Sequence, residues 1–225
     1  MITSTSNGQI KKIQQLLKKS KVRREEGLFI AEGLKMFREA PADRIEKVYL
    51  SGAFAEKGTW KEILREKGLE KEEREIIEVV EDKVFKTLSD TVTPQGVLCL
   101  IKMRDCTLEE LVPEGKVPLL MILEDLQDPG NLGTILRTGE GAGVTGIILS
   151  KNSVDIYNPK VIRSTMGSVY RMPFYYTSSI QEEILPWLRE KKITGYAAHL
   201  EGKNSYDQED YTKGTAFLLE MKEMD

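Results

Sequence analysis

Residues 119–143 read Leu-Leu-Met-Ile-Leu-Glu-Asp-Leu-Gln-Asp-Pro-Gly-Asn-Leu-Gly-Thr-Ile-Leu-Arg-Thr-Gly-Glu-Gly-Ala-Gly. The first five form an apolar run with the length of a buried strand, and Asp-Pro-Gly marks a turn after it. From Leu132 onward, apolar residues recur at helical spacing. The segment therefore predicts strand, turn and helix. Its polar residues fall at the carboxyl end of the strand, where open α/β sheets bind their ligands.

Two polar side chains of this segment are candidate site residues. Asn131 stands where the helix is expected to begin, so it can be interpreted as an N-cap or as a functional amide. Arg137 lies away from the apolar face of the helix. It can be interpreted as a surface residue paired with Glu140, three residues on, or as part of a site. The residues alone leave both alternatives open.

Strands and helices alternate through the rest of the chain. In the N-terminal part, we expect strands at 28–31, 47–50, 76–80 and 96–102, and helices at 10–17, 33–40, 59–67 and 82–89. Further on, we expect strands at 119–123, 146–150, 171–175, 193–198 and 215–219, and helices at 131–142, 158–166 and 180–191. The pattern predicts an α/β fold: a small domain at 1–104, a linker at 105–117 and a second domain at 118–225 with a mostly parallel sheet.

Composition favours a globular protein outside the membrane. Of 225 residues, 40% are hydrophobic and 31% are charged, and no apolar run reaches the ~20 residues of a membrane span. The N-terminus lacks the apolar core of a signal peptide, so we expect a cytoplasmic location. Cys99 and Cys106 show no metal-binding spacing, and we expect both to be reduced, with Cys99 in the core of a strand.

Charge is unevenly distributed, although the net charge is only −3. The first 24 residues contain no acid and seven basic residues, which are Lys11, Lys12, Lys18, Lys19, Lys21, Arg23 and Arg24. The last 25 residues carry seven acids against three lysines. A basic N-terminal segment can meet a phosphate backbone, although lysine-rich helix faces are also ordinary on globular proteins.

The glycines at 141, 143 and 146 match G-x-G-x-x-G, the dinucleotide-binding pattern. We reject that interpretation because the pattern must follow a strand and open a helix. Here it closes the helix predicted at 131–142 and leads into the strand predicted at 146–150. No metal-ligand cluster, nucleophile triad or phosphate-binding P-loop is visible either.

The segment Asp128-Pro129-x-Asn131-x-Gly133-x-x-x-Arg137-Thr138 resembles the first signature of the SpoU (TrmH-like) family of RNA ribose 2′-O-methyltransferases, in the knotted SPOUT superfamily. The similarity continues outside this segment. Ile2-Thr3-Ser4, Lys11 and Gly27–Gly33 resemble the substrate-binding domain that many members carry, and Val154–Ser168 resembles the segment after the second strand of the catalytic domain.

This resemblance implies a small N-terminal domain similar to ribosomal protein L30e, followed by an α/β-knot (SPOUT) methyltransferase domain. The implied reaction transfers a methyl group from S-adenosylmethionine to a ribose 2′-hydroxyl of structured RNA, with rRNA favoured over tRNA, without a metal and in a homodimer. Arg137 would hold the adjacent phosphate and stabilise charge on the 2′-oxygen, because a guanidinium is too basic to act as a general base. Asn131 would position the ribose or the arginine.

The resemblance also implies further contacts. The expected RNA-binding residues are Lys11, Lys18, Lys19, Arg23, Arg24, Arg163 and Ser164. The backbone around Ala198 and His199, after the strand at 193–198, would line the cofactor pocket. A solvated loop histidine is an equally good interpretation of His199.

The chain ends at Asp225, ahead of the Gly-Asn-Glu-Gly-x-Gly and Asn-Val-Ser-x-Ala segments of the family. In the family, these two segments form the knot, hold most of the cofactor and build much of the dimer interface. We therefore expect a SPOUT domain without its C-terminal knot segment and weak binding of S-adenosylmethionine. The alternative function is a catalytically inactive RNA-binding remnant, produced by truncation or frameshift. A small-molecule enzyme is a third, weaker alternative, because no acid/base pair is visible.

Overall fold

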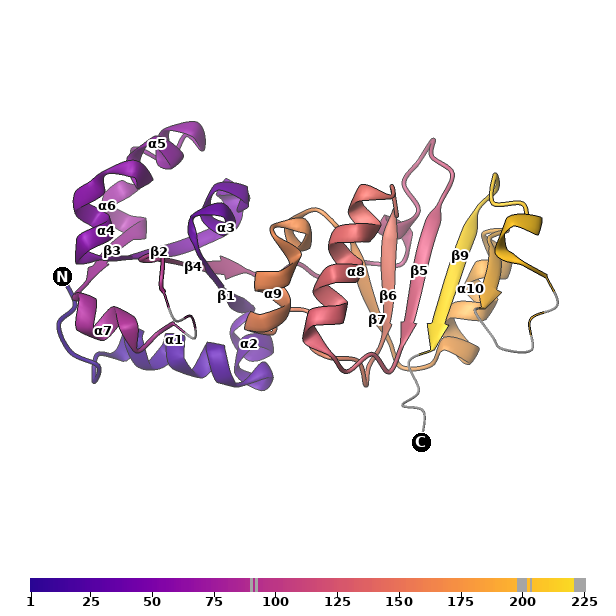
Figure 1. The fold of residues 1–225 in the computed structure, drawn as a ribbon, viewed down its shortest axis with the longest axis horizontal. Helices are drawn as coiled ribbons and strands as arrows, with labels where there is room; N and C mark the ends of the chain where they lie inside the picture. Colours follow the sequence, from indigo (N-terminus) through magenta and orange to yellow (C-terminus); the bar gives the residue numbers. More distant parts are fainter. Residues whose placement is uncertain (90, 92, 198–201, 203, 221–225) are drawn as a thin grey trace. The chain divides into compact units, whose positions relative to one another are not determined.

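The computed structural model describes residues 1–225 with the exception of 90, 92, 198–201, 203 and 221–225. The chain divides into two compact units, each with its own sheet (Figure 1). The N-terminal unit comprises Met1–Arg104 and Tyr157–Tyr170, and the C-terminal unit comprises Asp105–Ile156 and Arg171–Asp225. Among the helices that are described, none has the length and apolar character needed to cross a bilayer.

The N-terminal unit is built on a mixed sheet of four strands in the order β1-β4-β2-β3. The strands are β1 (Leu28–Glu32), β2 (Ile45–Ser51), β3 (Ile77–Val80) and β4 (Val97–Lys102). Strand β4 pairs antiparallel with β1 and β2, and β2 pairs parallel with β3. The helices are α1 (Gly8–Lys18), α2 (Ser20–Glu26), α3 (Leu34–Glu39), α4 (Gly52–Lys57), α5 (Thr59–Glu66), α6 (Glu73–Ile76) and α7 (Asp82–Lys86). The four predicted strands and four predicted helices are confirmed, whereas α2, α4 and α6 were not predicted.

Helix α1 covers one face of this sheet through the apolar stripe that predicted it. Ile10, Ile13 and Leu16 are fully buried and pack in one cluster with Leu98 and Leu100 of β4. Successive side chains of a strand point to opposite faces. Cys99, between these two leucines, therefore faces the other side, where it is fully buried as a free thiol. The prediction that Cys99 is a core residue is confirmed.

Helix α9 (Pro159–Thr165) belongs to the N-terminal unit, although it follows a strand of the C-terminal unit in sequence. The ring of Tyr157 lies 4.5 Å from that of Phe29 in β1, and the Tyr170 hydroxyl donates to the Met36 carbonyl at 3.2 Å. The expected domain boundary at 118 therefore does not describe residues 157–170. Their apolar side chains are buried against β1 and α3.

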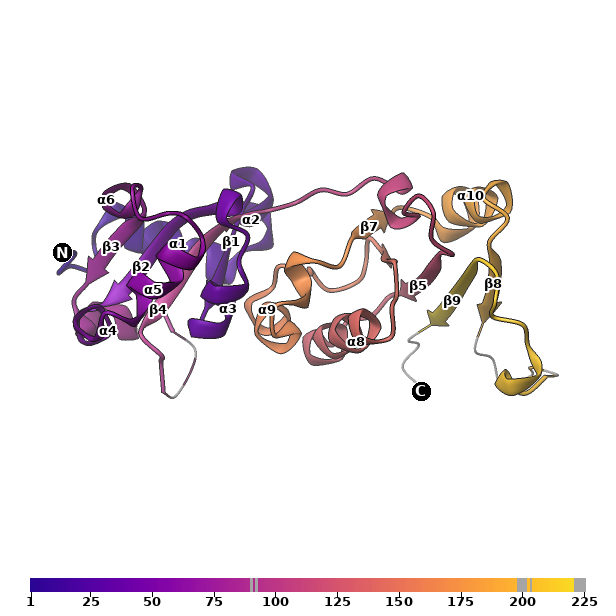
Figure 2. The same ribbon diagram turned by 90° about the horizontal axis from the view of Figure 1, so that it is seen from above.

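The C-terminal unit contains a sheet of five parallel strands in the order β7-β6-β5-β9-β8 (Figures 1 and 2). The strands are β5 (Leu119–Glu124), β6 (Gly146–Ser150), β7 (Phe174–Thr177), β8 (Thr194–Ala197) and β9 (Thr215–Glu220). A parallel sheet was predicted, and it is confirmed. The apolar run at 119–123 forms the middle strand, as expected of a strand that is covered on both faces.

Helical elements cover both faces of the parallel sheet. Helix α8 (Pro129–Gly141) packs on one face, where Gly139 approaches the Met121 sulfur. The other face is covered by the π-helix η4 (Ile180–Ile184), α10 (Leu185–Glu190) and the 3₁₀ turn η2 (Glu109–Leu111). The glycine pattern at 141–146 closes α8 and leads into β6, which confirms the rejection of a dinucleotide site.

The segment 105–117, expected to be a linker, contributes to the core of the C-terminal unit. Cys106 is buried, and Leu111 is fully buried in the same apolar cluster as Leu120 and Ile122 of β5. A Cβ on Gly146 would lie 2.4 Å from Cγ of Leu111. The absent side chain at Gly146 therefore lets η2 pack directly on β6.

Candidate functional site

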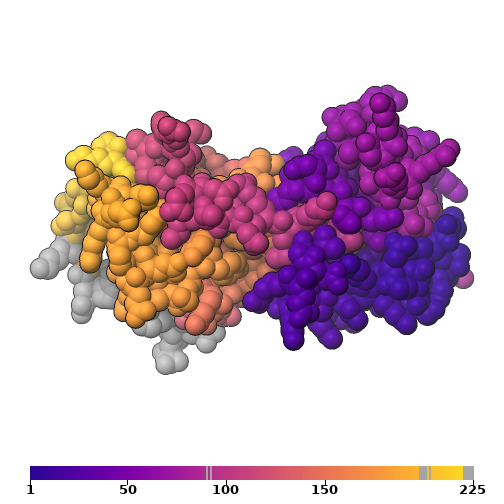
Figure 3. Space-filling view, turned by 180° about the vertical axis from the view of Figure 1, so that it is seen from behind, coloured from indigo at the N-terminus to yellow at the C-terminus, as the bar shows by residue number. Residues whose placement is uncertain are grey.

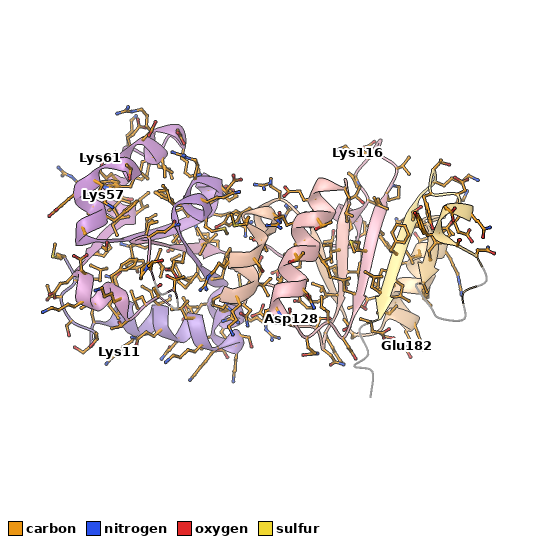
Figure 4. The ribbon with its side chains drawn as sticks, viewed as in Figure 1. Lys11, Lys57, Lys61, Lys116, Asp128 and Glu182 are labelled. Carbon is orange, nitrogen blue, oxygen red and sulfur yellow. The ribbon has the colours of Figure 1, made fainter. Side chains whose placement is uncertain are left out.

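The polar residues of the 124–131 segment lie at the carboxyl end of the parallel sheet. Figure 4 shows Asp128 and Glu182 at the end to which the strands point, and Lys116, which precedes β5, at the opposite end. Ligands of open parallel sheets bind outside the carboxyl ends of the strands. The candidate site therefore lies at that end of the C-terminal unit.

The loop after β5 is held to the end of β6. Asp125 has a positive φ of 52°, which is uncommon for a residue other than glycine. Its backbone N–H donates to the Ser150 hydroxyl at 2.9 Å, and that hydroxyl donates back to the Asp125 carboxylate at 2.8 Å. Gln127 donates its side-chain amide to the Asn152 carbonyl at 2.7 Å. These bonds fix the start of α8 relative to the sheet.

Helix α8 begins three residues earlier than the N-cap interpretation of Asn131 requires. Asp128 is the N-cap, its carboxylate accepts from the Asn131 backbone N–H at 2.6 Å, and Pro129 occupies the first helical position. Proline fits there because the first N–H of a helix has no partner within the helix. The N-cap interpretation of Asn131 is therefore wrong. Its side chain is exposed and, among the described residues, takes no hydrogen bond.

Arg137 lies on the exposed face of α8, which it shares with Asn131, Thr134 and Thr138. Within the described part of the chain, its guanidinium has no hydrogen bond or ion pair. The surface pair with Glu140 does not form, because Glu140 binds the guanidinium of Arg171 instead. Side chains of a helix lean toward its N-terminus, so Arg137 leans toward the end of α8 at which Asn131 lies, about 9 Å away along the axis.

A polar cavity of about 210 Å³ lies beside this loop, at the carboxyl ends of β5, β6 and β7. Its lining includes Glu124, Asp125, Lys151, Ser179 and Gln181. Helix η4 contributes part of this lining, and the carboxylate of Glu183 holds η4 to β7. Glu183 accepts from the Thr177 hydroxyl and the Tyr175 hydroxyl, each at 2.5 Å. These two hydrogen bonds lower the pKa of Glu183, and the bond to Glu183 raises the pKa of Tyr175.

A second cavity, of about 440 Å³, lies at the carboxyl ends of β8 and β9. Four aromatic residues line it, and three of them form a cluster: the ring centroid of Tyr211 lies 4.9 Å from that of Tyr196 and 5.2 Å from that of Phe217. Asn204 and Glu209 add polar groups. Ala198 and His199, the expected cofactor residues, lie outside the described residues, whereas Ala197 before them lines this cavity.

The N-terminal helices present most of the expected RNA-binding cations to solvent. Lys11, Lys18, Lys19 and Arg24 are exposed. Figure 4 shows Lys11 on the outer side of α1, and the indigo side chains of this region form an open surface in Figure 3. Lys12 pairs with Glu26 at 2.6 Å, so part of the local charge is compensated.

Arg23 does not belong to this exposed group. It is only 3% exposed, and its guanidinium donates to the Leu16 carbonyl at 2.6 Å. The last carbonyls of a helix have no partner within the helix, so Arg23 of α2 closes the end of α1. The expectation that Arg23 contacts RNA is corrected: its side chain is structural.

The two expected residues of α9 differ from each other. Arg163 is exposed, and it lines two hollows on the surface of the N-terminal unit. The Ser164 hydroxyl donates to the carbonyls of Lys160 and Val161, at 3.0 and 2.9 Å, within its own helix. Arg163 therefore remains a candidate for RNA contact. Ser164 is a weaker candidate, because its hydroxyl already donates within its own helix.

Sequence motifs do not identify the polar residues that follow β6 and β7, nor the aromatic residues of β8, of β9 and of the segment between them. A signal for part of the first group was present, because Lys151 and Asn152 directly follow the strand predicted at 146–150. Such positions lie at the ligand-binding edge of a parallel sheet. The aromatic group had no comparable signal, since its members are separated by up to 21 positions along the chain.

Comparison with known proteins agrees with this architecture. Residues 118–219 match the SpoU rRNA Methylase family, and residues 7–99 match the MRM3-like substrate binding domain. The human protein "rRNA methyltransferase 3, mitochondrial" is 32% identical over 178 residues, which cover 77% of this chain and 40% of that protein. An uncharacterized tRNA/rRNA methyltransferase of Synechocystis is 35% identical, over 84% of this chain and 65% of its own length. The chain thus spans less than two thirds of either relative.

Among solved structures, an AdoMet-bound rRNA methyltransferase from Sinorhizobium meliloti superposes with a TM-score of 0.79 at 28% identity. The superposition covers 96% of this chain and 79% of that one. Both units of the structure and the strand-turn-helix segment at 119–143 are accounted for by these matches. The chain belongs to the SpoU (TrmH-like) family of RNA methyltransferases, with an MRM3-like substrate-binding domain ahead of the SpoU domain.

Proposed function

We propose that this protein transfers a methyl group from S-adenosylmethionine to a ribose 2′-hydroxyl of structured RNA, with rRNA as the favoured substrate. One observation carries the proposal. Arg137 and Asn131 are exposed on α8 at the carboxyl end of a parallel sheet, and neither side chain has a partner among the described residues. The rRNA methyltransferases among the relatives support the choice of substrate.

Arg137 acts on the nucleophile through charge. The 2′-hydroxyl loses its proton to solvent water as its oxygen attacks, because a guanidinium stays protonated and cannot accept that proton. It can donate two parallel hydrogen bonds, to the adjacent phosphate and to the 2′-oxygen as negative charge develops there. A guanidinium without a protein partner is available for both.

Asn131 positions the substrate. Its backbone N–H is engaged by Asp128, which fixes its place in the first turn of α8. Its amide is exposed and can both donate to and accept from a ribose hydroxyl. Asp128 therefore supports the site through the helix start, and Asn131 contacts the ribose.

The aromatic cavity at the ends of β8 and β9 fits the adenosine part of the cofactor. Its volume lies within the usual range for small-molecule sites, about 300–1,000 Å³. Tyr196, Tyr211 and Phe217 offer apolar ring surface, and the Glu209 carboxylate can accept from ribose hydroxyls. When bound, S-adenosylmethionine supplies a methyl group on a sulfonium, a reagent that needs no metal ion.

RNA binds through the exposed cations of the N-terminal unit. Lys11, Lys18, Lys19 and Arg24 lie on α1 and α2, and Arg163 lies on α9 of the same unit. Neutralising phosphates with such residues releases counterions, so the affinity falls as salt rises. We further propose a cytoplasmic location, which the two buried free thiols support, and a homodimer, which the family resemblance supports.

The test uses tritiated S-adenosylmethionine, rRNA and the purified chain. A methyl group on the 2′-oxygen protects the neighbouring phosphodiester from alkali, so the label should appear in alkali-resistant dinucleotides. Label in mononucleotides would indicate base methylation and contradict the proposal. RNA binding without any methyl transfer would favour the inactive remnant instead.

A further inference from the structure

A cavity of about 310 Å³ in the N-terminal unit is not explained by the proposed catalytic site. It is lined by the end of β1, the start of α3, the end of α9 and the residues Thr91, Thr93 and Gln95. Its lining includes Glu32, Lys35, Thr93, Gln95, Arg163 and Met166. We call it the Lys35 cavity. Residues of the MRM3-like domain and of the SpoU segment thus line one cavity.

Two cations at the cavity are free to bind an anion. The side chains of Lys35 and Arg163 are exposed, and neither has a hydrogen bond or ion pair within the range that the structure describes. By contrast, Lys12 and Arg38 of the same unit form ion pairs with Glu26 and Glu66. Phosphate suits both, and arginine can bind it with two parallel bonds.

The polar groups of the cavity are held in place and still offer hydrogen bonds. Gln95 accepts from the Leu34 backbone N–H at 2.7 Å through Oε1, which leaves its amide N–H₂ to donate. Ser89 and Thr91 both donate to Oε1 of Glu32, at 2.5 and 3.1 Å. Oε2 of Glu32 accepts no hydrogen bond from the described residues. The lining of the cavity therefore offers both an acceptor and a donor, the two kinds of group that bind the edge of a nucleobase.

An apolar surface completes the cavity. Met36 is buried, and Met166 is 42% exposed although it is a large hydrophobic residue. Met166 also has a positive φ of 54°, so the backbone is held in an uncommon conformation where this side chain is presented. A methionine side chain adapts its shape and contacts aromatic rings favourably.

The cavity also connects to the basic helices. A smaller crevice shares Glu32 and Arg163 with it and is lined by Leu17, the residue before Lys18 and Lys19. Arg163 thus lies between the C-terminal end of α1 and the Lys35 cavity.

We propose that the Lys35 cavity binds one unpaired nucleotide of the RNA. Arg163 and Lys35 hold its phosphates, Glu32 and Gln95 read the edge of its base, and Met166 packs on the base. This proposal rests on the proposed function in taking RNA as the polymer. It assigns to the N-terminal unit a preference for an unstacked nucleotide rather than for a regular duplex, and duplex RNA offers no splayed base.

The first test removes the charges in matched pairs. The double variant Lys35→Gln/Arg163→Gln is compared with Lys57→Gln/Arg74→Gln, which removes the same charge from exposed residues of α4 and α6 in the same unit. Lys57 and Arg74 have no ion pair with any residue that the structure describes. Figure 4 shows Lys57 on the other side of the sheet from Lys11. The readout is fluorescence anisotropy of a labelled single-stranded oligoribonucleotide across a salt series. The first pair should flatten the plot of log affinity against log salt by about 1.4, for two lost phosphate contacts, and the second should leave it unchanged. Equal effects of the two pairs would overturn the proposal.

The second test fills the cavity. Thr93→Trp places a ring in it, and Thr59→Trp, at an exposed position of α5, is the control. Thr93→Trp should weaken binding of the intact oligonucleotide by about fivefold or more and should not change binding of the same oligonucleotide with abasic positions. Equal losses for both oligonucleotides, or no RNA binding by the parent chain, would overturn the proposal. These binding assays contain no methyl donor, so they test the cavity and not methyl transfer. A chain that shows the expected binding but transfers no methyl group in the tritium assay would overturn the proposed function alone.

Discussion

Two adjacent arginines have different roles, although both belong to the basic N-terminal segment. Arg23 is buried with its guanidinium on the Leu16 carbonyl, whereas Arg24 is exposed without a partner among the described residues. A basic run in the sequence gives the same weight to both. The end of α1 distinguishes them, because its unpaired carbonyl requires a donor.

We expect Arg23→Gln to lower the free energy of unfolding by about 1.5–3 kcal/mol, since a buried carbonyl loses a charged donor. Arg24→Gln should change it by no more than about 0.5 kcal/mol. Urea titration measures both. Among the folded variants at low salt, Arg24→Gln should bind RNA more weakly than Arg23→Gln does. Equal unfolding midpoints would contradict the structural role of Arg23.

Gly33 joins β1 to α3 and lines the Lys35 cavity. Its φ of 107° and ψ of 156° belong to a region that only glycine occupies readily. A Cβ there would lie 3.1 Å from Oε1 of Gln95, the atom that accepts from Leu34. Glycine is therefore required by both the backbone and its neighbour.

Gly33→Ala should destabilise the protein by about 1–3 kcal/mol. Gly8→Ala is the matched control, because a Cβ on Gly8 meets nothing within 4 Å and alanine suits the start of α1. Differential scanning fluorimetry should show a lower melting temperature for the first variant and an equal or higher one for the second. A parent-like melting temperature for Gly33→Ala would refute the argument.

The site residues were predicted unequally well. The exposure of Arg137 follows from helical spacing and was predicted correctly. The role of Asn131 at the start of the helix was not, because Asp128 and Asn131 are both good caps. The structure selects Asp128, since Pro129 then falls at the first helical position.

At the scale of elements, the join between η4 and α10 shows the limit of a periodic pattern. A single helix was predicted at 180–191, but the structure has a π-helix followed by an α-helix. Pro186 in the first turn of α10 explains the change of hydrogen bonding, because proline has no N–H to donate. The spacing of apolar residues predicts the buried faces of η4 and α10, but it does not predict the change from π-helix to α-helix between them.

Glu183 fastens η4 to β7 and makes this join sensitive to pH. Its pKa is lowered in the folded protein from an ordinary value of 4.5, so the stabilisation is complete above that value and is lost as pH falls through the folded pKa. Glu183→Gln should therefore lower the melting temperature at neutral pH, and the difference from the parent should shrink in acid.

The control is Glu182→Gln, at the neighbouring exposed position labelled in Figure 4. Its side chain takes no hydrogen bond from the described residues, so its melting curve should follow the parent at every pH. Melting by circular dichroism from pH 7 to pH 3 distinguishes the variants. A loss for Glu183→Gln that does not depend on pH would show that the carboxylate charge is irrelevant.

At the scale of the whole molecule, the order of elements was predictable and their partners were only partly so. The parallel sheet follows from short apolar strands alternating with helices, because parallel neighbours need long crossovers. The place of α9 did not follow. Periodicity shows that Val161 and Ile162 are buried, but it does not show that β1 rather than the parallel sheet covers them. The same holds for Leu111, whose burial the charged segment around it concealed.

The central claim is that Arg137 stabilises the ribose oxygen and does not hold the cofactor or the fold. Arg137→Ala should lower the rate of methyl transfer to rRNA about a hundredfold to a thousandfold, as expected for loss of one preorganised charged donor. Arg137→Lys should recover little, since an ammonium lacks the planar pair of donors. Arg189→Ala, at an exposed arginine of α10 in the same unit, should retain the parent rate.

The decisive measurement sets the turnover rate of Arg137→Ala beside its affinity for S-adenosylmethionine, determined by calorimetry. Loss of an interaction made mainly in the transition state lowers the turnover rate and leaves the affinity for S-adenosylmethionine close to the parent value. The account predicts this separation. Turnover within about threefold of the parent, or a cofactor affinity that falls in step with the rate, would contradict it.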